Sequence, residues 1–469
     1  MTAVSSLDGI FLELEDDDPA AHMHIGAILP FDPLPGDRPD PFTRVEALLH
    51  ERLDALPRLR QRLSEDRVGG LAWPSWVDDD RFDLAHHVHR VALPQPCGAA
   101  ELDEWSGDFF GRRLNRSRPL WEAAVIERLD DGGWALAIKL HHCVADGLGS
   151  LQLAYRLLGS EPAAPPPAPP QRTAASAALR EGAAVVRGGA DALAHPRRSA
   201  ASLAAGAELL ARERLAPPPQ TSVNGEIGSA RAFTSVTVPL RELRAISRAL
   251  GGTVTDALLA TVAGALRTLL TERGERCPHD GLRAMVPVDI RAAGSEPEGN
   301  HISSLFVALP VALGHPLARH AAVRRETERR KHSSQSGGSS LLLELSSLAP
   351  PAVHHRLAQL FATPRLFNLT VTSMRGPERP LRVGRARLRE VRALVPLAQG
   401  HRLGIAIVSH GAATTYGVIA DRDTVPDLDR FAAALREEHA ELRRAARRRN
   451  AAMRRGGPAI ASALEGVPD

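Results

Sequence analysis

The sequence predicts an α/β protein built from two similar halves. Short apolar runs of strand length alternate with longer stretches of helical spacing in residues 1–160, and they do so again in residues 230–450. Between them, residues 161–229 contain a Pro- and Ala-rich stretch that cannot hold a regular ladder, so we expect a linker there and a tail at 451–469. The chain has 469 residues, and its apolar content of 43% supports a real core.

The first half reads as three strands and three helices. Val45, Leu48 and Leu49 show the helical spacing of a segment that ends before Pro57. Two apolar runs flank the turn at 130–133 and form a predicted hairpin. The predicted strands are Met23–Phe31, Ala123–Leu129 and Trp134–His142, and the predicted helices are Pro41–Leu56, Trp105–Leu114 and Gly149–Leu158.

The second half repeats this alternation without an obvious sequence repeat. Its last two strands form a predicted hairpin around Gly411. The predicted strands are Phe233–Val238, Arg283–Val288, Ser303–Leu313, Asn368–Ser373, Leu403–Ser409 and Thr414–Ile419, and the predicted helices are Pro239–Leu250, Val254–Leu270, Ala318–Gln335 and Pro426–Arg449.

Composition excludes several functional classes. The net charge of +3 is small, so it does not indicate nucleic acid as a partner. Three widely spaced cysteines without a CxxC favour neither structural disulfides nor zinc, and we expect no metal site. We expect no leader, membrane span or nucleotide cradle. The amphipathic segment 174–215 is either a solvated surface helix or a contact with anionic membrane head groups.

The most informative motif is HHxxxDG at the end of a predicted strand, from His141 to Gly147. Histidine can accept and return a proton near neutral pH, which suits an acyl-transfer site. Successive strand residues point to opposite faces, so His141 and His142 should not share one site. One ring should face a reaction channel and the other should pack in the scaffold; alternation alone does not say which. It also disfavours a two-histidine metal centre and a thiol nucleophile at Cys143.

Beyond this motif, the chain resembles the bacterial wax ester synthase/acyl-CoA:diacylglycerol acyltransferase family. The resemblance spans nearly the whole chain, in order. It rests on Ser6-Leu7-Asp8 with Phe11-Leu12, Met23-His24-Ile25-Gly26, Arg118-Pro119-Leu120-Trp121, Pro287-Val288-Asp289-Ile290-Arg291, Gly299-Asn300, Asn368-Leu369-Thr370-Val371 with Gly376-Pro377, Pro396-Leu397 with Gly400, and Asp421 with Pro426-Asp427.

The resemblance implies two chloramphenicol-acetyltransferase-like domains with a substrate channel between them. It implies an O-acyltransferase that moves a long-chain acyl group from acyl-CoA, with no cofactor, to diacylglycerol or a long-chain alcohol. The site residues it implies are His142 as general base, His141 in support, Asp146 as a structural brace paired with Arg291, Gly147 in the turn, and Asn300, Thr255 and Asp256 at the substrate.

Two departures from the family pattern concern substrate preference. Thr255 stands where the family has Asn, and Arg375 precedes Gly376-Pro377 where a proline is usual. Two alternatives therefore stay open: a same-fold acyltransferase for a polyketide-type alcohol or an amine, and a lipid-binding or lipid-droplet protein without turnover. We expect a cytoplasmic protein, free or peripheral at the inner face of the plasma membrane or on lipid droplets, with no nucleic-acid partner.

Overall fold

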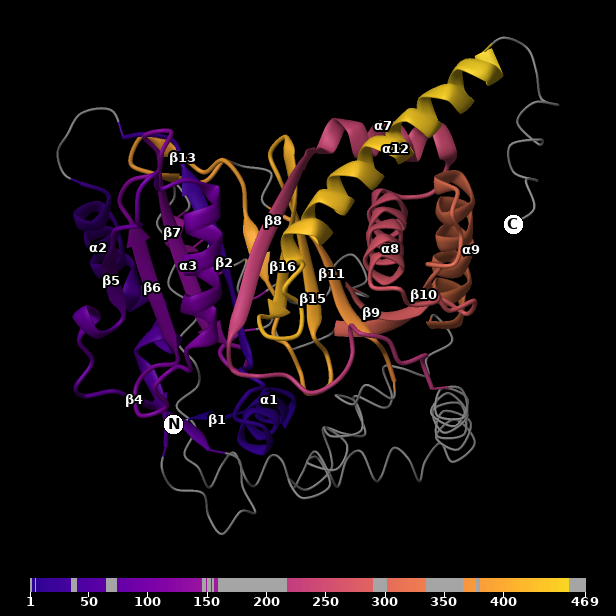
Figure 1. Cartoon of the computed structure of the whole chain (residues 1–469). Helices are drawn as coiled ribbons and strands as arrows, with labels where there is room; N and C mark the ends of the chain where they lie inside the picture. The colour runs from indigo at the N-terminus through magenta and orange to yellow at the C-terminus, as the bar shows by residue number, and fades with distance from the viewer. Residues whose placement is uncertain are drawn as a thin grey trace, which may run out of the picture.

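Two sheets organise the part of the chain that the structure describes (Figure 1). The computed structural model describes residues 2–4, 6–34, 40–64, 74–145, 149, 153, 156–158, 217–289, 302–334, 366–376 and 380–454. The predicted strand at 23–31 and the predicted hairpins at 123–142 and 403–419 are present, each within a few residues of the expected bounds.

The first sheet carries the strand that leads into the histidine pair. Its five strands run in the order β14-β2-β7-β6-β5. All neighbours are antiparallel except β5 and β6. The strands are β2 (His24–Phe31), β5 (Val88–Val91), β6 (Trp121–Ile126), β7 (Trp134–His141) and β14 (Arg392–Leu394). The central strand β7 is buried along nearly its whole length, which matches its almost continuous apolar sequence.

The second sheet has six strands in the order β10-β9-β11-β15-β16-β8. Strand β11 is parallel to both of its neighbours, and the other pairs are antiparallel. The strands are β8 (Arg231–Pro239), β9 (Leu282–Asp289), β10 (Ile302–Leu309), β11 (Leu369–Arg375), β15 (Leu403–His410) and β16 (Ala413–Asp421). Strand β10 ends before Pro310, which lacks the N–H that a ladder needs, although we had expected it to reach Leu313.

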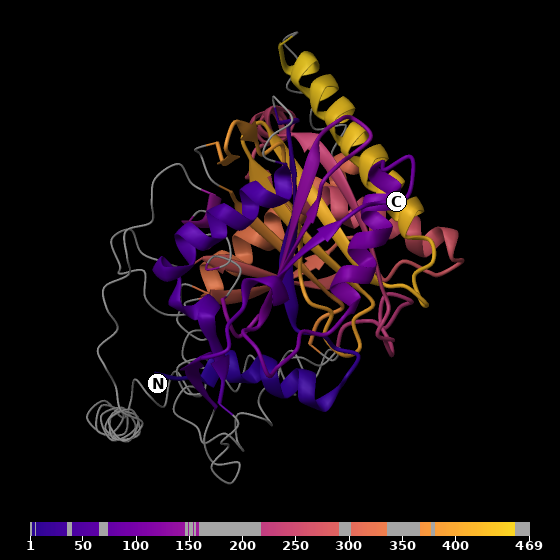
Figure 2. The ribbon, with the colours of Figure 1, turned by 90° about the vertical axis from the view of Figure 1, so that its left-hand side faces the viewer.

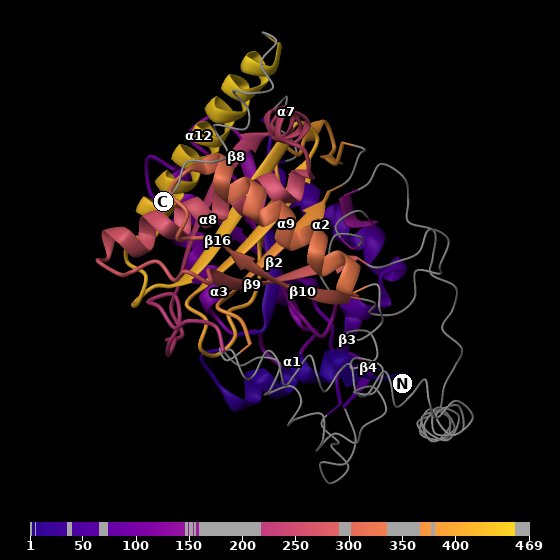
Figure 3. The same cartoon turned by 90° about the vertical axis from the view of Figure 1, so that its right-hand side faces the viewer.

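Helices cover both sheets. Four of them pack on the second sheet, on the side that faces the viewer in Figure 3. They are α7 (Leu240–Leu250), α8 (Val254–Glu272), α9 (Pro316–Ser334) and α12 (Leu428–Arg454), while α1 (Ser6–Asp17), α2 (Pro41–Arg52) and α3 (Ala99–Gly111) belong to the first half. Helix α3 begins six residues before the predicted Trp105, because Glu101 caps it by accepting from the Gly98 N–H at 2.8 Å.

Short elements from both halves of the sequence lie beside the first sheet, on the side of the molecule that faces the viewer in Figure 2. A three-stranded sheet has the order β1-β4-β3, and a two-stranded ribbon joins β12 and β13. Their bounds are β1 (Thr2–Ala3), β3 (Gln61–Leu63), β4 (Ser75–Asp78), β12 (Arg382–Val383) and β13 (Ala386–Arg387), with 3-10 turns at Leu53–Ala55, Pro57–Arg60 and Leu84–His86.

Helix α8 is the one described helix whose length and composition would suit a membrane span. However, 72% of its most apolar window is buried inside the protein. It packs against α7, α9, α12 and β10. These contacts are those of a central core helix.

One strand from the second half of the sequence joins the sheet of the first half. Residues 392–394 lie in the second half of the sequence, yet β14 pairs with Gly26, Ala27 and Ile28 at the edge of the first sheet. Beside it, Gly417 of β16 runs so close to β14 that a Cβ would lie 1.9 Å from the Ala393 carbonyl oxygen. The first hydrophobic core also includes Phe233 and Ile419 from the second sheet, so the halves share a core.

Candidate active site

The end of β7 is clamped by hydrogen bonds from both neighbouring segments. The His141 N–H donates to the Leu120 carbonyl at 3.0 Å, and the His142 N–H donates to the Met23 carbonyl at 2.8 Å. The strand ends at His141, and the chain then turns, with the Val144 N–H donating to the His141 carbonyl at 2.9 Å. His142 is thus the first residue of a tight turn that both flanking segments hold in place.

His141 belongs to the scaffold. Its side chain is 1% exposed. Its Nδ1 accepts a hydrogen bond from the Cys143 N–H at 3.1 Å, and its Nε2 lies 3.5 Å from Glu15 Oε2. Burial lowers the pKa of His141, partly opposed by Glu15, so the ring is neutral at pH 7. In the neutral ring the proton is therefore assigned to Nε2, because Nδ1 is the acceptor.

His142 has a different environment. It is half-buried, and its ring stacks on Phe11 of α1 with centroids 3.8 Å apart and an interplanar angle of 18°. Its Nδ1 is buried and makes no hydrogen bond to any described residue. Burial lowers the pKa of His142 to about 4, with a further contribution from neighbouring His141. The ring is therefore in the proton-accepting form at neutral pH.

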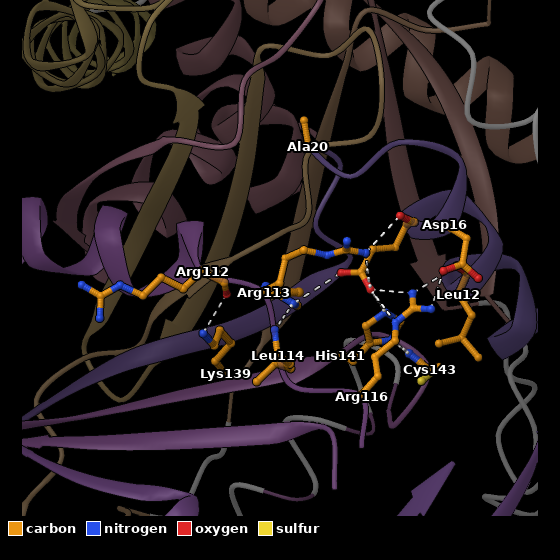
Figure 4. Close-up of polar contacts among 12 residues, drawn as sticks. Leu12, Asp16, Ala20, Arg112, Arg113, Leu114, Arg116, Lys139, His141 and Cys143 are labelled. Carbon is orange, nitrogen blue, oxygen red and sulfur yellow. Dashed lines mark hydrogen bonds and ion pairs between the residues drawn. The ribbon is translucent and has the colours of Figure 1, made fainter. Parts of the chain in front are cut away.

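Glu15 on α1 has a buried carboxylate close to this turn, and the sequence analysis did not predict it. Glu15 pairs with Arg116 of the loop between α3 and β6 and lies near His24 and His141. Figure 4 shows its neighbours Arg113, Arg116 and His141. Burial opposes its ionisation, but His141 and Arg116 outweigh it and hold the pKa of Glu15 far below its usual range.

Lys139 points to the same side of β7 as His141 and fastens α3. Its fully buried ammonium donates to the carbonyls of Phe109 at 2.9 Å and Arg112 at 3.0 Å, and it pairs with Glu122 at 3.0 Å. Figure 4 shows the contact between Lys139 and Arg112. A cation at the last carbonyls of a helix is electrostatically favourable. Lys139 thereby ties α3 to the strand that carries the histidines.

The other expected site residues divide into two groups. Asp146, Gly147, Arg291 and Asn300 lie outside the described residues. Thr255 is half-buried in the first turn of α8.

Asp256 serves the fold. Its Oδ2 accepts from the Thr253 N–H at 2.6 Å, and its Oδ1 accepts from the Thr327 hydroxyl at 2.7 Å. The side chain is 2% exposed, and the reciprocal bond from the Asp256 N–H to the Thr253 hydroxyl completes a capping box. Both carboxylate oxygens are thus used within the protein, which gives Asp256 a helix-capping role, and its expected substrate contact stays a prediction.

Among the residues in view, no group of three or more His, Cys, Asp or Glu side chains could hold a metal ion. The group in view at the turn is a neutral imidazole stacked on an aromatic ring.

Comparisons with known proteins identify the family of this chain. Residues 4–258 match the wax ester synthase/diacylglycerol acyltransferase catalytic domain, and residues 298–443 match the C-terminal domain of the same family. The chain belongs to the wax ester synthase/diacylglycerol acyltransferase family. It is an acyltransferase, as the sequence predicted.

Individual relatives of this acyltransferase agree over the full length. The probable diacylglycerol O-acyltransferase tgs1 of Mycobacterium tuberculosis is 33% identical over 467 residues, covering 97% of this chain and 99% of that protein. The probable diacylglycerol O-acyltransferase tgs2 of the same species is 31% identical, covering 93% and 98%.

Solved structures support the predicted fold class. The wax ester synthase/diacylglycerol acyltransferase of Marinobacter aquaeolei matches with a TM-score of 0.69 at 27% identity, covering 95% of this chain and all of that one. The first condensation domain of the calcium-dependent antibiotic synthetase matches with a TM-score of 0.61 at 18% identity, covering 94% and 97%. The two-domain α/β expectation is confirmed.

Proposed function

We propose that this acyltransferase moves a long-chain acyl group from acyl-CoA to the hydroxyl of diacylglycerol or of a long-chain alcohol, with His142 as the general base. The observation that carries the assignment is the contrast between the two histidines. Both rings are neutral, but His141 is 1% exposed and its Nδ1 is occupied, whereas His142 is half-buried and its Nδ1 makes no hydrogen bond to any described residue. The full-length relatives named as diacylglycerol O-acyltransferases support the acceptor.

In the proposed reaction, a ring nitrogen of His142 takes the proton of the acceptor hydroxyl as its oxygen attacks the thioester carbonyl carbon. The tetrahedral intermediate then expels CoA as its thiolate, and the imidazolium returns the proton to that sulfur. The products are an ester and free CoA, and no acyl-enzyme forms because the hydroxyl is itself the nucleophile.

The test is the release of CoA thiol by the purified protein. Long-chain acyl-CoA is offered with diacylglycerol, hexadecanol, a polyketide-type alcohol or an amine, and the ester product is identified. Thiol release that depends on the first two acceptors supports the proposal. Preference for an amine, or for a carrier-protein thioester over CoA, indicates a condensation-type enzyme, and tight acyl binding without thiol release for any acceptor indicates a lipid-binding protein.

The acid limb of the pH profile should lie well below that of an ordinary histidine. The neutral imidazole is the active form, and a pKa of about 4 keeps His142 neutral as the pH falls. We therefore expect kcat/KM to stay nearly constant from neutral pH to about 5 and to fall near 4. Half-loss near 6.5 would contradict the assignment.

A control for acid unfolding accompanies this measurement. His22, His142 and His401 all have pKa values lowered to about 4 by burial. Between the ordinary pKa of 6.5 and about 4, the unfolded chain binds protons that the folded chain does not, so these groups reduce stability as pH falls through that window. Enzyme held at each pH is therefore returned to pH 7 and assayed again.

A further inference from the structure

One carboxylate oxygen, Oε2 of Glu15, makes most of the polar contacts next to the turn that presents His142. Glu15 is 2% exposed. Its Oε2 accepts from Arg116 Nη2 at 2.6 Å and from Arg116 Nε at 3.0 Å, and it lies 3.3 Å from Arg113 Nη2. The backbone carbonyl of Glu15 accepts from the same Arg113 nitrogen at 3.1 Å. Two arginines thus hold this carboxylate charged and fixed in place.

The same oxygen faces the scaffold histidine. Oε2 lies 3.5 Å from Nε2 of His141, the nitrogen that carries the proton when Nδ1 accepts from Cys143. The remaining neighbour, His24, presents Nε2 at 3.6 Å from Oε1, but that nitrogen already accepts the Leu114 N–H at 3.4 Å. The N–H that Glu15 can orient is therefore that of His141.

The ring of His141 also holds the backbone just after His142. Its Nδ1 holds the Cys143 N–H, and Cys143 directly follows His142. A rotated or otherwise protonated ring would release this N–H, and the peptide groups on the carboxyl side of His142 would lose an anchor. The Glu15–His141–Cys143 chain of contacts therefore ends at the turn that presents His142.

We propose that Glu15 is a positioning residue for acyl transfer, which fixes the orientation and tautomer of His141 and, through the Cys143 N–H, the turn that presents His142. This inference rests on the function proposed above for His142. A carboxylate that holds a histidine in one tautomer is a known means of supporting catalysis without touching the substrate. The alternative role for Glu15 is only to neutralise Arg113 and Arg116.

Kinetics of the full-length protein separate these roles. In Glu15→Gln the charge is lost, so we expect kcat to fall on the order of 10–100-fold, the range seen when a histidine loses its orienting partner. KM for acyl-CoA should change by less than about twofold, because no substrate contact is removed. Asp16→Asn is the matched control, because Asp16 also pairs with Arg116, at 2.5 Å, but is far more exposed. Its kcat should stay within about twofold of wild type.

A double-mutant cycle tests whether Glu15 acts through His141. In His141→Asn the amide oxygen can still accept the Cys143 N–H, but the side chain is too short to reach Glu15. If the proposal holds, adding Glu15→Gln to His141→Asn lowers kcat by less than about threefold, although it costs 10–100-fold in wild type. Effects that multiply independently overturn the proposal.

Folding is followed for each variant by circular dichroism and thermal unfolding. If Glu15→Gln does not fold, Glu15→Asp keeps the charge, shortens the side chain and is read in the same way. A folded, less stable Glu15 variant with wild-type kcat overturns the proposal and assigns Glu15 to arginine neutralisation alone. If the wild-type protein releases no CoA with any acceptor, the proposed function fails, and that outcome is distinct from failure of the Glu15 role.

Discussion

Replacement of His142 by alanine is expected to lower kcat on the order of 10²–10⁴-fold, the usual contribution of a general base. The loss should fall on kcat, because the imidazole acts on the proton that moves in the transition state and contributes little to ground-state binding. The fold should survive, since the ring is half-buried and its described contact is the stack on Phe11. Thiol release from long-chain acyl-CoA measures the loss, and circular dichroism verifies the fold.

His89→Ala provides a matched control for this measurement. His89 lies on β5 of the same sheet, is exposed, and is remote in sequence from the motif. Its removal should leave kcat within about twofold of wild type, as for most exposed positions. A His142→Ala enzyme that keeps most of its activity would show that another group removes the proton and would end the assignment of His142.

Replacement of Asp421 by alanine should destabilise the protein by about 3–5 kcal/mol, as when one partner of a buried ion pair is removed. Asp421 at the end of β16 is completely buried, and its Oδ1 lies 3.8 Å from Arg231, itself 2% exposed. The same carboxylate accepts from the Gly228 N–H at 2.8 Å and the Thr424 hydroxyl at 2.6 Å. Alanine removes all of these acceptors and leaves the guanidinium buried without its counter-charge.

Urea unfolding measures this loss, and two variants calibrate it. Asp421→Asn keeps one acceptor oxygen, so it should be less destabilising than alanine. Arg422→Ala removes a neighbouring but exposed ion pair with Asp108, 2.7 Å long, and should cost about 0–1 kcal/mol. Equal effects of Asp421→Ala and Arg422→Ala would contradict the importance assigned to the buried pair.

Local pattern was sufficient for most helices and strands, because their signals lie within the segments themselves. At the two histidines the structure differs from the predicted strand: β7 ends at His141, so His142 leaves the strand and alternation along a strand does not apply to the pair. Contacts that join distant segments could not be predicted in this way. Strand β14 has three residues and pairs with β2 more than 360 residues away in sequence, so no local periodicity marks it.

The site shows the same limit. Glu15 lies in an acidic run that reads as a solvated surface, and only the arrival of Arg116 and His141 from elsewhere in the chain makes its carboxylate a buried partner. The family resemblance implied a substrate-binding role for Asp256. Its position three residues after Thr253 is, in retrospect, a capping-box signal that sequence reasoning could have used.

The pairing of β14 with β2 has a consequence for biosynthesis. The first sheet carries β7, which leads into the histidine pair, but its outer edge beside β2 is paired with described residues from the second half of the sequence, at 387–389 and 392–394. A ribosome must therefore add more than 360 residues after β2 before β14 can pair with that edge. Until then the nascent chain exposes unpaired backbone groups at Gly26–Ile28, a ready template for pairing with another chain. During synthesis, this open edge is a natural place for a chaperone to act.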